Sequence, residues 1–310
     1  MNRRQFVKKS GGALCLASLS PGWQLMDLPQ IPPNQSPYIC IFSKHLQWLG
    51  YREMALLAGK LGFTGIDLTV RPEGHVTPAN ARVELPEAVH QIRDAGLEVP
   101  MITTAITDPD DPVTWNILET AGKLGIHLYR PGWFRYLDEP GVEDQLRMAS
   151  RQLSKLQEVN RSANIAASYQ NHSGNYIGSS GWDLLQIMEG LDPDWVGIQF
   201  DIRHAMVEGP ESWPYVLELL APYINSLDIK DYTWDSSDGI RLLNVPLGQG
   251  LVPFGDYFEQ LDRLEIKANF SLHFEYPLGG AEHGAQELAI PREEFEKQVQ
   301  ADLRYLENLL

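Results

Sequence analysis

The sequence lacks several features that would assign it to common classes of protein. Its 310 residues include only two cysteines, Cys15 and Cys40, and no apolar run approaches the roughly 18 residues that a membrane helix needs. Basic residues are also scarce, because 25 Lys and Arg stand against 41 Asp and Glu, which gives a net charge of -16. Such a surface repels phosphate backbones and anionic lipid. We therefore expect neither a membrane span nor a nucleic-acid partner.

Three glycine-containing motifs are missing as well. No Gly-x-Gly-x-x-Gly turn follows the first predicted strand, no Lys-Ser or Lys-Thr pair follows the clusters "PLGQG" and "PLGGAEHG", and no Gly-x-Ser-x-Gly elbow occurs. These absences argue against an open dinucleotide-binding sheet, a phosphate loop and a serine hydrolase. We interpret both glycine clusters as turns.

The first twenty residues read as a targeting segment. Arg3 and Arg4 precede two lysines and a weakly apolar stretch, and residues 1–20 resemble a twin-arginine export signal. Residues 21–36 are rich in proline and aperiodic, which predicts a linker. We expect the twin-arginine export machinery as a partner and a periplasmic location; the alternative is a basic N-terminus of a cytoplasmic protein. Removal of the signal leaves Cys40 alone, so no internal disulfide can form.

Residues 37–310 alternate between short runs typical of strands and longer runs of helical period. Eight such pairs in sequence predict parallel strands with crossover helices, and a sheet of eight such strands closes on itself. We therefore predict a single (β/α)8 TIM barrel. The expected strands are "YICIFS", "GIDLTV", "VPMITTAI", "IHLYRPG", "NIAASYQNHS", "VGIQFDIRHA", "NSLDIKDYTW" and "NFSLHFEYP".

The last four predicted strands carry polar residues on the face that points into the barrel. In such a barrel the C-terminal strand ends carry the chemistry, and alternate residues face inward. The inward residues are predicted to be Ser168, Gln170, His172, Gly197, Gln199, Asp201, Ser226, Asp228, Lys230, Ser271, His273 and Glu275. A buried carboxylate is costly unless it serves a partner, a cation or a ligand, so this pattern predicts a functional site.

Three acids among these residues favour a divalent metal. Asp201, Asp228 and Glu275, with the amide oxygen of Gln170, would form a hard oxygen site suited to magnesium, manganese or calcium rather than structural zinc. His172, His204 and His273 lie close enough in the sequence to act as further ligands. The alternative is that each acid pairs with a basic residue of the barrel, for which the candidates are Lys230, Arg203, Arg130 and Arg71.

Over roughly residues 37–310, the motifs "DIRH", "DIKD" and "HFEYP" resemble those of the xylose isomerase-like TIM barrel superfamily, which includes ketose 3-epimerases. The resemblance implies a small-molecule carbohydrate as substrate and a divalent metal, with manganese, magnesium or cobalt preferred over zinc. Matched by position, Asp201 and Glu275 are metal ligands. Asp228 stands where the family usually has histidine, and Gln170 where it usually has glutamate.

The resemblance also implies proton abstraction beside a sugar carbonyl. Gln170 cannot act as a base, which leaves Glu275 as the general base and His204 and Lys230 as donors to a substrate oxygen. Aldose–ketose isomerisation or epimerisation, β-elimination from a 3-keto glycoside by a lyase, and silent carbohydrate binding all remain open, as does a homo-oligomer. The expected substrate-binding residues are Arg71, His75, Arg130, Trp133, Asn171 and His172. Apurinic endonucleases share the superfamily, but the acidic balance argues against that activity.

Overall fold

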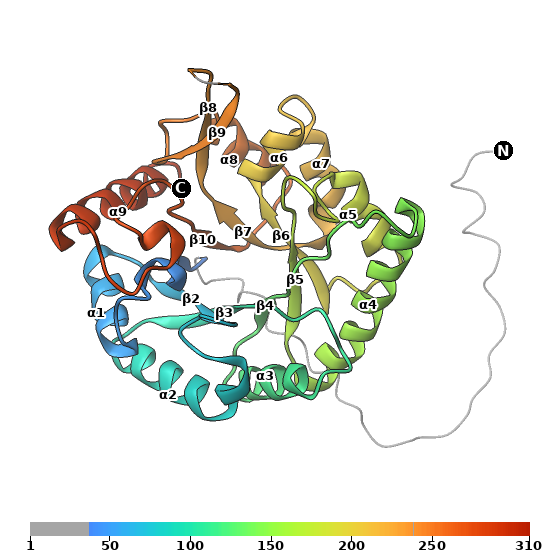
Figure 1. Ribbon diagram of the computed structural model, residues 1–310, viewed down its shortest axis with the longest axis horizontal. Helices are drawn as coiled ribbons and strands as arrows, with labels where there is room; N and C mark the ends of the chain where they lie inside the picture. The colour runs from blue at the N-terminus through green and yellow to red at the C-terminus, as the bar shows by residue number, and fades with distance from the viewer. Residues whose placement is uncertain (1–36, 238) are drawn as a thin grey trace, which may run out of the picture.

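The computed structural model describes residues 37–237 and 239–310, so the predicted signal and linker lie outside the described residues. Eight parallel strands close into a barrel with the order β1-β10-β7-β6-β5-β4-β3-β2, which confirms the predicted (β/α)8 fold (Figure 1). The barrel strands are β1 (Ile39–Phe42), β2 (Gly65–Val70), β3 (Glu98–Thr104), β4 (Leu128–Arg130), β5 (Ala166–Gln170), β6 (Val196–Asp201), β7 (Ile224–Ile229) and β10 (Asn269–Leu272).

Helices surround the barrel in chain order (Figure 1). They are α1 (Tyr51–Leu61), α2 (Ala81–Asp94), α3 (Pro112–Lys123), α4 (Val142–Ala163), α5 (Gly181–Met188), α6 (Ile202–Glu208), α7 (Trp213–Leu220), α8 (Phe254–Arg263) and α9 (Arg292–Glu307). Short 3-10 helices are η2 (Ser43–Leu46), η3 (Pro78–Asn80), η4 (Ala221–Tyr223) and η5 (Ala281–His283). None of the helices in the described part of the chain is long and apolar enough to cross a membrane.

The strand register places the polar residues of neighbouring strands at the same height. Phe200 and Leu227 are paired in register and belong to the hydrophobic core. The next pair, Asp201 with Asp228, therefore points the other way, since successive side chains of a strand alternate between its faces. Asp228 is also in register with Ser271 on β10. The predicted parity of these strands is thus confirmed.

The region after β7 differs from the prediction, which extended one strand through "NSLDIKDYTW". β7 ends at Ile229, and the chain leaves the barrel as an antiparallel hairpin of β8 (Asp231–Asp235) and β9 (Arg241–Val245). The Asp231 carboxylate accepts hydrogen bonds from the backbone N–H of Gly248, Gly250 and Val252 at 2.9–3.1 Å. These bonds fix the return of the chain from the hairpin.

Several predicted strands also end earlier than expected, and two of these ends affect site residues. β6 ends at Asp201, whose side chain caps α6 by accepting from the backbone N–H of His204 at 3.1 Å. β10 ends at Leu272, so His273 and Glu275 lie in the loop that follows it. As a result, His204, His273 and Glu275 lie on the segments that follow the strand ends at the barrel mouth.

Candidate active site

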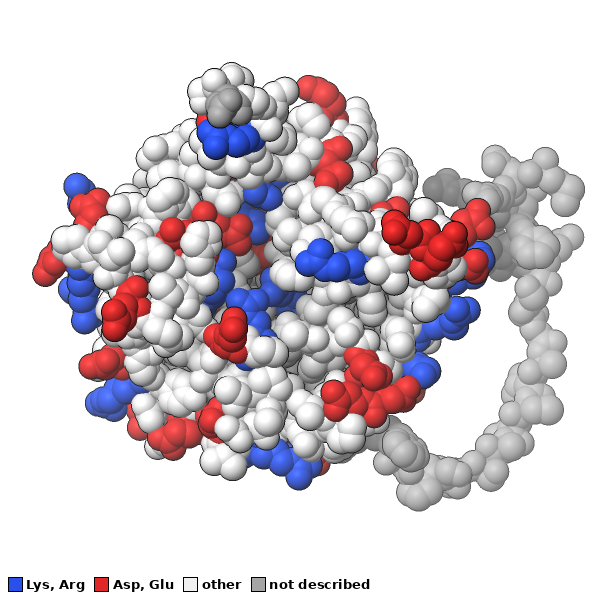
Figure 2. Space-filling model, in the orientation of Figure 1, with Lys and Arg blue, Asp and Glu red and all other residues white. Residues whose placement is uncertain are grey.

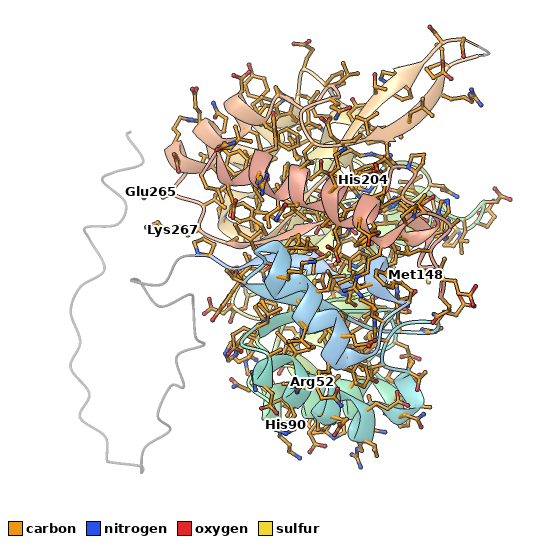
Figure 3. The ribbon with its side chains drawn as sticks, turned by 90° about the vertical axis from the view of Figure 1, so that its left-hand side faces the viewer. Arg52, His90, Met148, His204, Glu265 and Lys267 are labelled. Atoms are coloured by element: carbon orange, nitrogen blue, oxygen red, sulfur yellow. The ribbon has the colours of Figure 1, made fainter. Side chains whose placement is uncertain are left out.

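The polar residues of β5, β6, β7 and β10 converge at the C-terminal end of the barrel. Figure 2 shows Lys and Arg side chains gathered in a hollow at the centre of the molecule. Figure 3 shows Glu265 and Lys267, in the loop before β10, at the opposite end of the barrel from the β8–β9 hairpin. Because β5 ends at Gln170, β6 at Asp201 and β7 just before Lys230, the polar residues lie at the face where the strands end.

Gln170, at the end of β5, lies at the centre of a buried hydrogen-bond network. Its Oε1 accepts from Arg130 Nη1 at 2.7 Å, and its Nε2 donates to Asp201 Oδ2 at 2.9 Å and to Asp228 Oδ2. Because Arg130 can only donate, its position fixes which end of the amide carries the oxygen. The carboxylates therefore face an amide N–H2 group.

Lys230, immediately after β7, is the cation closest to the acids. Its Nζ lies 2.9 Å from Asp201 Oδ2 and 3.6 Å from Glu275 Oε1, and it is only 3% exposed. Arg71, Arg130 and Arg203 form no salt bridge with any described residue. The alternative of pairing with a basic residue thus holds for Lys230 with Asp201 and Glu275, and not for the arginines.

Glu275 is the most accessible of the three acids. Its side chain is 25% exposed, whereas the side chains of Asp201 and Asp228 are fully buried. Lys44 Nζ lies 3.5 Å from Glu275 Oε1, and His273 Nδ1 lies 3.9 Å from it. Burial acts to raise the pKa of Glu275, but Lys230, His273 and Lys44 outweigh it and hold the pKa well below its usual value. Glu275 is therefore ionised at neutral pH.

The pKa values of His204 and His273 shift in opposite directions because the neighbours of the two rings differ. Burial, together with Lys230, holds the pKa of His204 well below its usual value. The Nε2 of this ring lies 3.0 Å from Lys230 Nζ, and its Nδ1 lies 2.8 Å from Ser173 Oγ and 2.9 Å from Arg203 Nη1. Burial lowers the pKa of His273, but Asp228, whose Oδ1 lies 3.2 Å from Nε2, outweighs burial and raises it. Neutral His204 therefore contacts and orients Lys230, whereas Asp228 shifts His273 toward its protonated form.

The predicted substrate-binding residues divide into two groups. Arg71, Arg130, Trp133 and His172 lie at or just after the ends of β2, β4 and β5. The His172 ring lies 4.0 Å from that of His204 and 4.8 Å from that of Trp133, between centroids. Burial lowers the pKa of His172 to about 4, and Lys230 contributes to this shift, so the ring is neutral.

His75 and Asn171 are instead occupied by the protein. His75 Nε2 contacts the Leu46 carbonyl at 3.2 Å, and burial lowers the pKa of His75 to about 4. The Asn171 amide exchanges two hydrogen bonds, of 2.7 and 2.9 Å, with the Asp201 backbone. Both side chains shape the rim by holding segments together, and their role in substrate binding stays a prediction.

Four further residues of the site were not singled out as functional from the sequence. Gln199 donates to Asp228 Oδ1 at 2.6 Å, and Lys44 approaches Glu275. Asp67, on β2, accepts from Thr103 and Ser271 at 2.8 Å, and Phe42 stacks on His273 with ring centroids 4.4 Å apart. Inward parity on β2 could have indicated Asp67, whereas Lys44 lies in η2, where strand parity carries no information.

The donor set does not fit the divalent metal predicted from the sequence. Within the described residues, no group of three or more His, Cys, Asp or Glu side chains is arranged to hold a metal ion. The Gln170 oxygen, the expected fourth ligand, is used by Arg130, and its N–H2 group faces Asp201 and Asp228. An N–H donor cannot ligate a cation, and the Lys230 ammonium already contacts Asp201 and Glu275. Gln170, Asp201 and Glu275 instead belong to a network of hydrogen bonds and ion pairs with Arg130 and Lys230.

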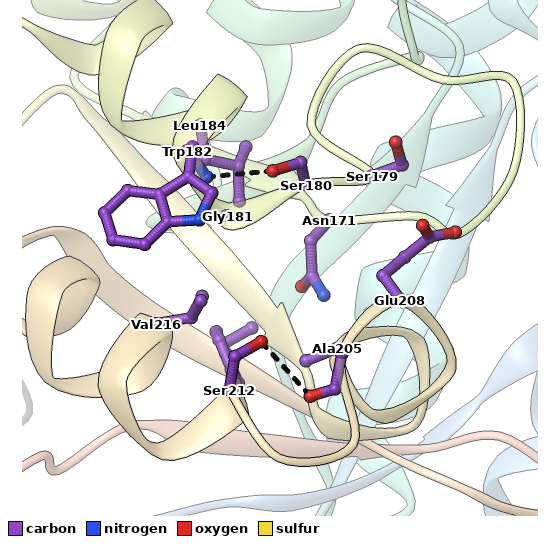
Figure 4. A pocket seen from close by; sticks show the side chains of 12 residues that line it. Asn171, Ser179, Ser180, Gly181, Trp182, Leu184, Ala205, Glu208, Ser212 and Val216 are labelled. Carbon is purple, nitrogen blue, oxygen red and sulfur yellow. Dashed lines mark hydrogen bonds between the residues drawn. The ribbon is translucent and has the colours of Figure 1, made fainter.

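A separate cavity of about 200 Å³ lies beside the mouth, among α5, α6 and α7 (Figure 4). Asn171 borders it, together with Ser180, Ser212 and Glu208. The Ser180 hydroxyl caps α5 by accepting from Trp182 N at 3.2 Å, and the Ser212 hydroxyl donates to the Gly209 carbonyl at 3.4 Å. Both hydroxyl groups already have hydrogen-bond partners within the protein. The cavity therefore offers a ligand fewer free polar groups than the barrel mouth does.

The comparisons with known proteins agree with this architecture. The profile of the family described as "Xylose isomerase-like TIM barrel" matches residues 55–309. None of the curated proteins matches the chain. Among solved structures, D-psicose 3-epimerase from Clostridium cellulolyticum H10 is similar with a TM-score of 0.66 at 13% identity, covering 88% of this chain and 99% of that one.

Two other solved structures are similar to a comparable degree. L-ribulose 3-epimerase has a TM-score of 0.67 at 16% identity and covers 88% of this chain and 94% of its own. The 3-keto-D-glucoside 4-epimerase of E. coli has a TM-score of 0.61 at 16% identity, covering 84% of this chain and 94% of that one. At these identities the likeness shows a shared fold.

Proposed function

The chain belongs to the xylose isomerase-like TIM barrel family, and we propose that it is a sugar isomerase or epimerase that removes a proton beside a carbonyl group. The substrate in this proposal is a sugar or keto sugar bound in the barrel mouth. The similar solved structures include sugar epimerases, which supports the proposal. The observation that carries it is the environment of Glu275.

Glu275 has the properties of a general base. It is ionised, it is partly exposed where the other two acids are buried, and it is surrounded by groups that can donate hydrogen bonds. Its carboxylate takes the proton from carbon, and the electron pair left behind moves onto the carbonyl oxygen. Return of the proton to the carbonyl carbon, with transfer of the neighbouring hydroxyl proton to the oxyanion, gives isomerisation. Delivery of a different proton, from solvent, to the opposite face of the original carbon gives epimerisation.

Lys230 is suited to stabilise the oxyanion that forms during this step. Its ammonium lies next to the base, at 3.6 Å from Glu275 Oε1, and is oriented by Asp201 and neutral His204. A fixed positive charge in a site with little water stabilises developing negative charge strongly. The resemblance implied that a divalent metal supplies this charge, but because the donor set does not fit a metal, the proposal assigns the task to Lys230.

The test is exchange of a substrate proton with solvent. The protein is incubated in D2O with a panel of ketoses and 3-keto glycosides, with and without a chelator, and deuterium incorporation is followed by NMR. We expect exchange into at least one of these sugars, undiminished by the chelator. Glu275→Gln should lower the exchange rate by about 10²–10⁴-fold, the usual contribution of a general base.

Glu218→Gln is the matched control, because Glu218 forms an exposed salt bridge with Arg263 far from the mouth. It should exchange at the wild-type rate. Full exchange by Glu275→Gln would disprove the role of the base. Sugar binding without exchange in the wild-type protein would instead support a silent carbohydrate-binding barrel, and expulsion of a β-substituent would support the lyase alternative.

A further inference from the structure

The barrel mouth has a basic side formed by β1, β2 and β4. Phe42, the last residue of β1, is surrounded by three cations: Lys44 Nζ lies 5.6 Å from the ring centroid, and the guanidinium carbons of Arg71 and Arg130 lie at 5.3 and 5.7 Å. Each contact is a favourable cation–π arrangement, but the cations repel one another. Their convergence in a protein with a net charge of -16 needs an explanation.

The two arginines on this side carry donors that have no acceptor among the described residues. The Arg71 side chain makes no hydrogen bond or salt bridge with any described residue. Arg130 is 3% exposed, and although its Nη1 donates to Gln170, its Nε is buried without a partner. The Trp133 Nε1, beside Arg130, is also buried and unpaired. Buried donors are nearly always hydrogen-bonded, so these groups indicate a missing acceptor.

The acids of the site cannot supply that acceptor. Asp201, Asp228 and Glu275 contact Lys230, Gln170, Gln199 and His273, and on the basic side Glu275 contacts Lys44, not the two arginines. Asp67 is the acid on the basic side, and its two oxygens are taken by Thr103 and Ser271. Burial, and next to it the charge of Arg130, lowers the pKa of Arg71 to about 10, which is the direction expected where cations lack an anionic partner.

We propose that Arg71 and Arg130 bind an anionic oxygen group, a carboxylate or a phosphate, carried by the sugar substrate. Guanidinium groups bind such groups in bidentate geometry, which a neutral sugar hydroxyl cannot reproduce. This inference rests on the proposed function and deepens it: the substrate is an acidic sugar, whose charged end lies against β2 and β4 while its carbonyl end lies beside Glu275 and Lys230.

The experiment compares charged and neutral ligands that share one sugar ring. Binding of glucuronate, glucose 6-phosphate, glucose and inorganic phosphate to the full-length protein is measured by calorimetry. We expect one of the two acidic sugars to bind at least about tenfold more tightly than glucose, since a charge-assisted hydrogen bond contributes about that factor or more. The preferred ligand distinguishes a carboxylate from a phosphate site.

Two variants assign the binding to the proposed residues. Arg71→Gln should weaken binding of the acidic sugar about tenfold or more and leave binding of glucose unchanged. Arg151→Gln, which makes the same change on the exposed face of α4, should alter neither. Equal affinity for acidic and neutral sugars, equal loss of both in Arg71→Gln, or no binding of any anion at millimolar concentration would overturn the inference.

The outcomes separate this inference from the proposed function. Proton exchange into neutral ketoses, with no preference for acidic sugars, would leave the proposed function intact and refute the anionic substrate. Tight binding of an acidic sugar through Arg71, with no proton exchange in any acidic or neutral sugar of the panel, would support the anion site and refute the isomerase proposal.

Discussion

Gln170 holds its amide oxygen toward Arg130 and its amide nitrogen toward Asp201 and Asp228. A glutamate at this position would turn a carboxylate oxygen toward two buried carboxylates. Neighbouring carboxylates repel one another strongly where little water is present. A family member with three acids at these positions therefore needs a bound cation to hold the carboxylates together. The amide achieves the same cohesion by donating two hydrogen bonds.

Gln170→Glu should therefore make the protein dependent on a cation. We expect the variant to lose about 3 kcal/mol of unfolding free energy in the presence of a chelator, because a buried network loses its donor and gains a charge. Manganese should restore part of the loss, and the wild type should show no such response. Chemical denaturation with and without manganese measures both effects.

Gln298→Glu is the matched control for this prediction. Gln298 also donates to a carboxylate, that of Glu294 at 2.9 Å, but the pair lies on the surface of α9, where water screens the added charge. The unfolding free energy of this control should fall by less than about 1 kcal/mol, and manganese should not change it. If Gln170→Glu is as stable as the wild type with chelator present, Gln170 does not have the stabilising role described here.

For single residues, the sequence predicts which side chains face into the barrel better than it predicts what those side chains bind. The parity of the strands identified Gln170, Asp201, Asp228 and Lys230 as inward residues, because alternation along a strand depends on local geometry alone. Whether these acids meet a metal or an ammonium depends on side-chain rotamers and on Arg130, which comes from another strand. No periodicity within β5 or β7 carries that information.

The loop between β9 and α8 shows how individual acids organise an element. Asp231 accepts from Gly248, Gly250 and Val252, and Asp302 on α9 accepts from the backbone N–H of Leu247 at 3.2 Å. The loop is thus held from the hairpin on one side and from α9 on the other. Burial, and next to it the charge of Asp231, raises the pKa of Asp302 to about 7.

Asp302 should make stability depend on pH. Its pKa is near 4 in the unfolded chain and about 7 in the fold, so between these values the folded state binds more protons. The unfolding free energy should consequently fall as pH rises from 4 to 7, by about 1.4 kcal/mol for each unit of difference in pKa. Asp302→Asn should remove this decline, as measured by denaturation at several pH values.

Asp262→Asn, at an exposed position of α8, serves as the control for general charge effects. Its pH profile should run parallel to that of the wild type. If the difference in unfolding free energy between wild type and Asp302→Asn is independent of pH, the pKa of Asp302 is not raised in the folded protein.

The elements themselves were largely predictable, and the exceptions have local causes. The alternation of short β-type runs and helical runs gave the eight-stranded barrel, since each run carries its own period. The β8–β9 hairpin was missed because "DYTW" continues the β-type pattern of β7, and only the Asp-Gly pair in "DSSDGI" signals the turn. The acceptor that fixes the hairpin, Asp231, acts on residues that lie 17 to 21 positions away.

On the scale of the whole molecule, an acidic surface surrounds a basic mouth. The net charge of -16 keeps other polyanions away, but at physiological salt its field decays within about 8 Å. A small acidic sugar that reaches the mouth therefore responds to Arg71 and Arg130 rather than to the distant surface. The same distribution favours a small ligand over an extended nucleic acid, which would contact the acidic surface as well.

From the sequence of its N-terminus, we propose that the protein is exported through the twin-arginine machinery. Arg3 and Arg4 precede a weakly apolar stretch, as in signals of that pathway, and the mature chain would keep Cys40 alone, which is buried and cannot form an internal disulfide. Replacing Arg3 and Arg4 with lysine keeps the charge but removes the pair. We expect the variant to accumulate in the cytoplasm in cell fractionation, while Lys8→Arg, which also keeps the charge, is exported normally. If the double variant and the wild type occupy the same compartment, the two arginines do not direct export.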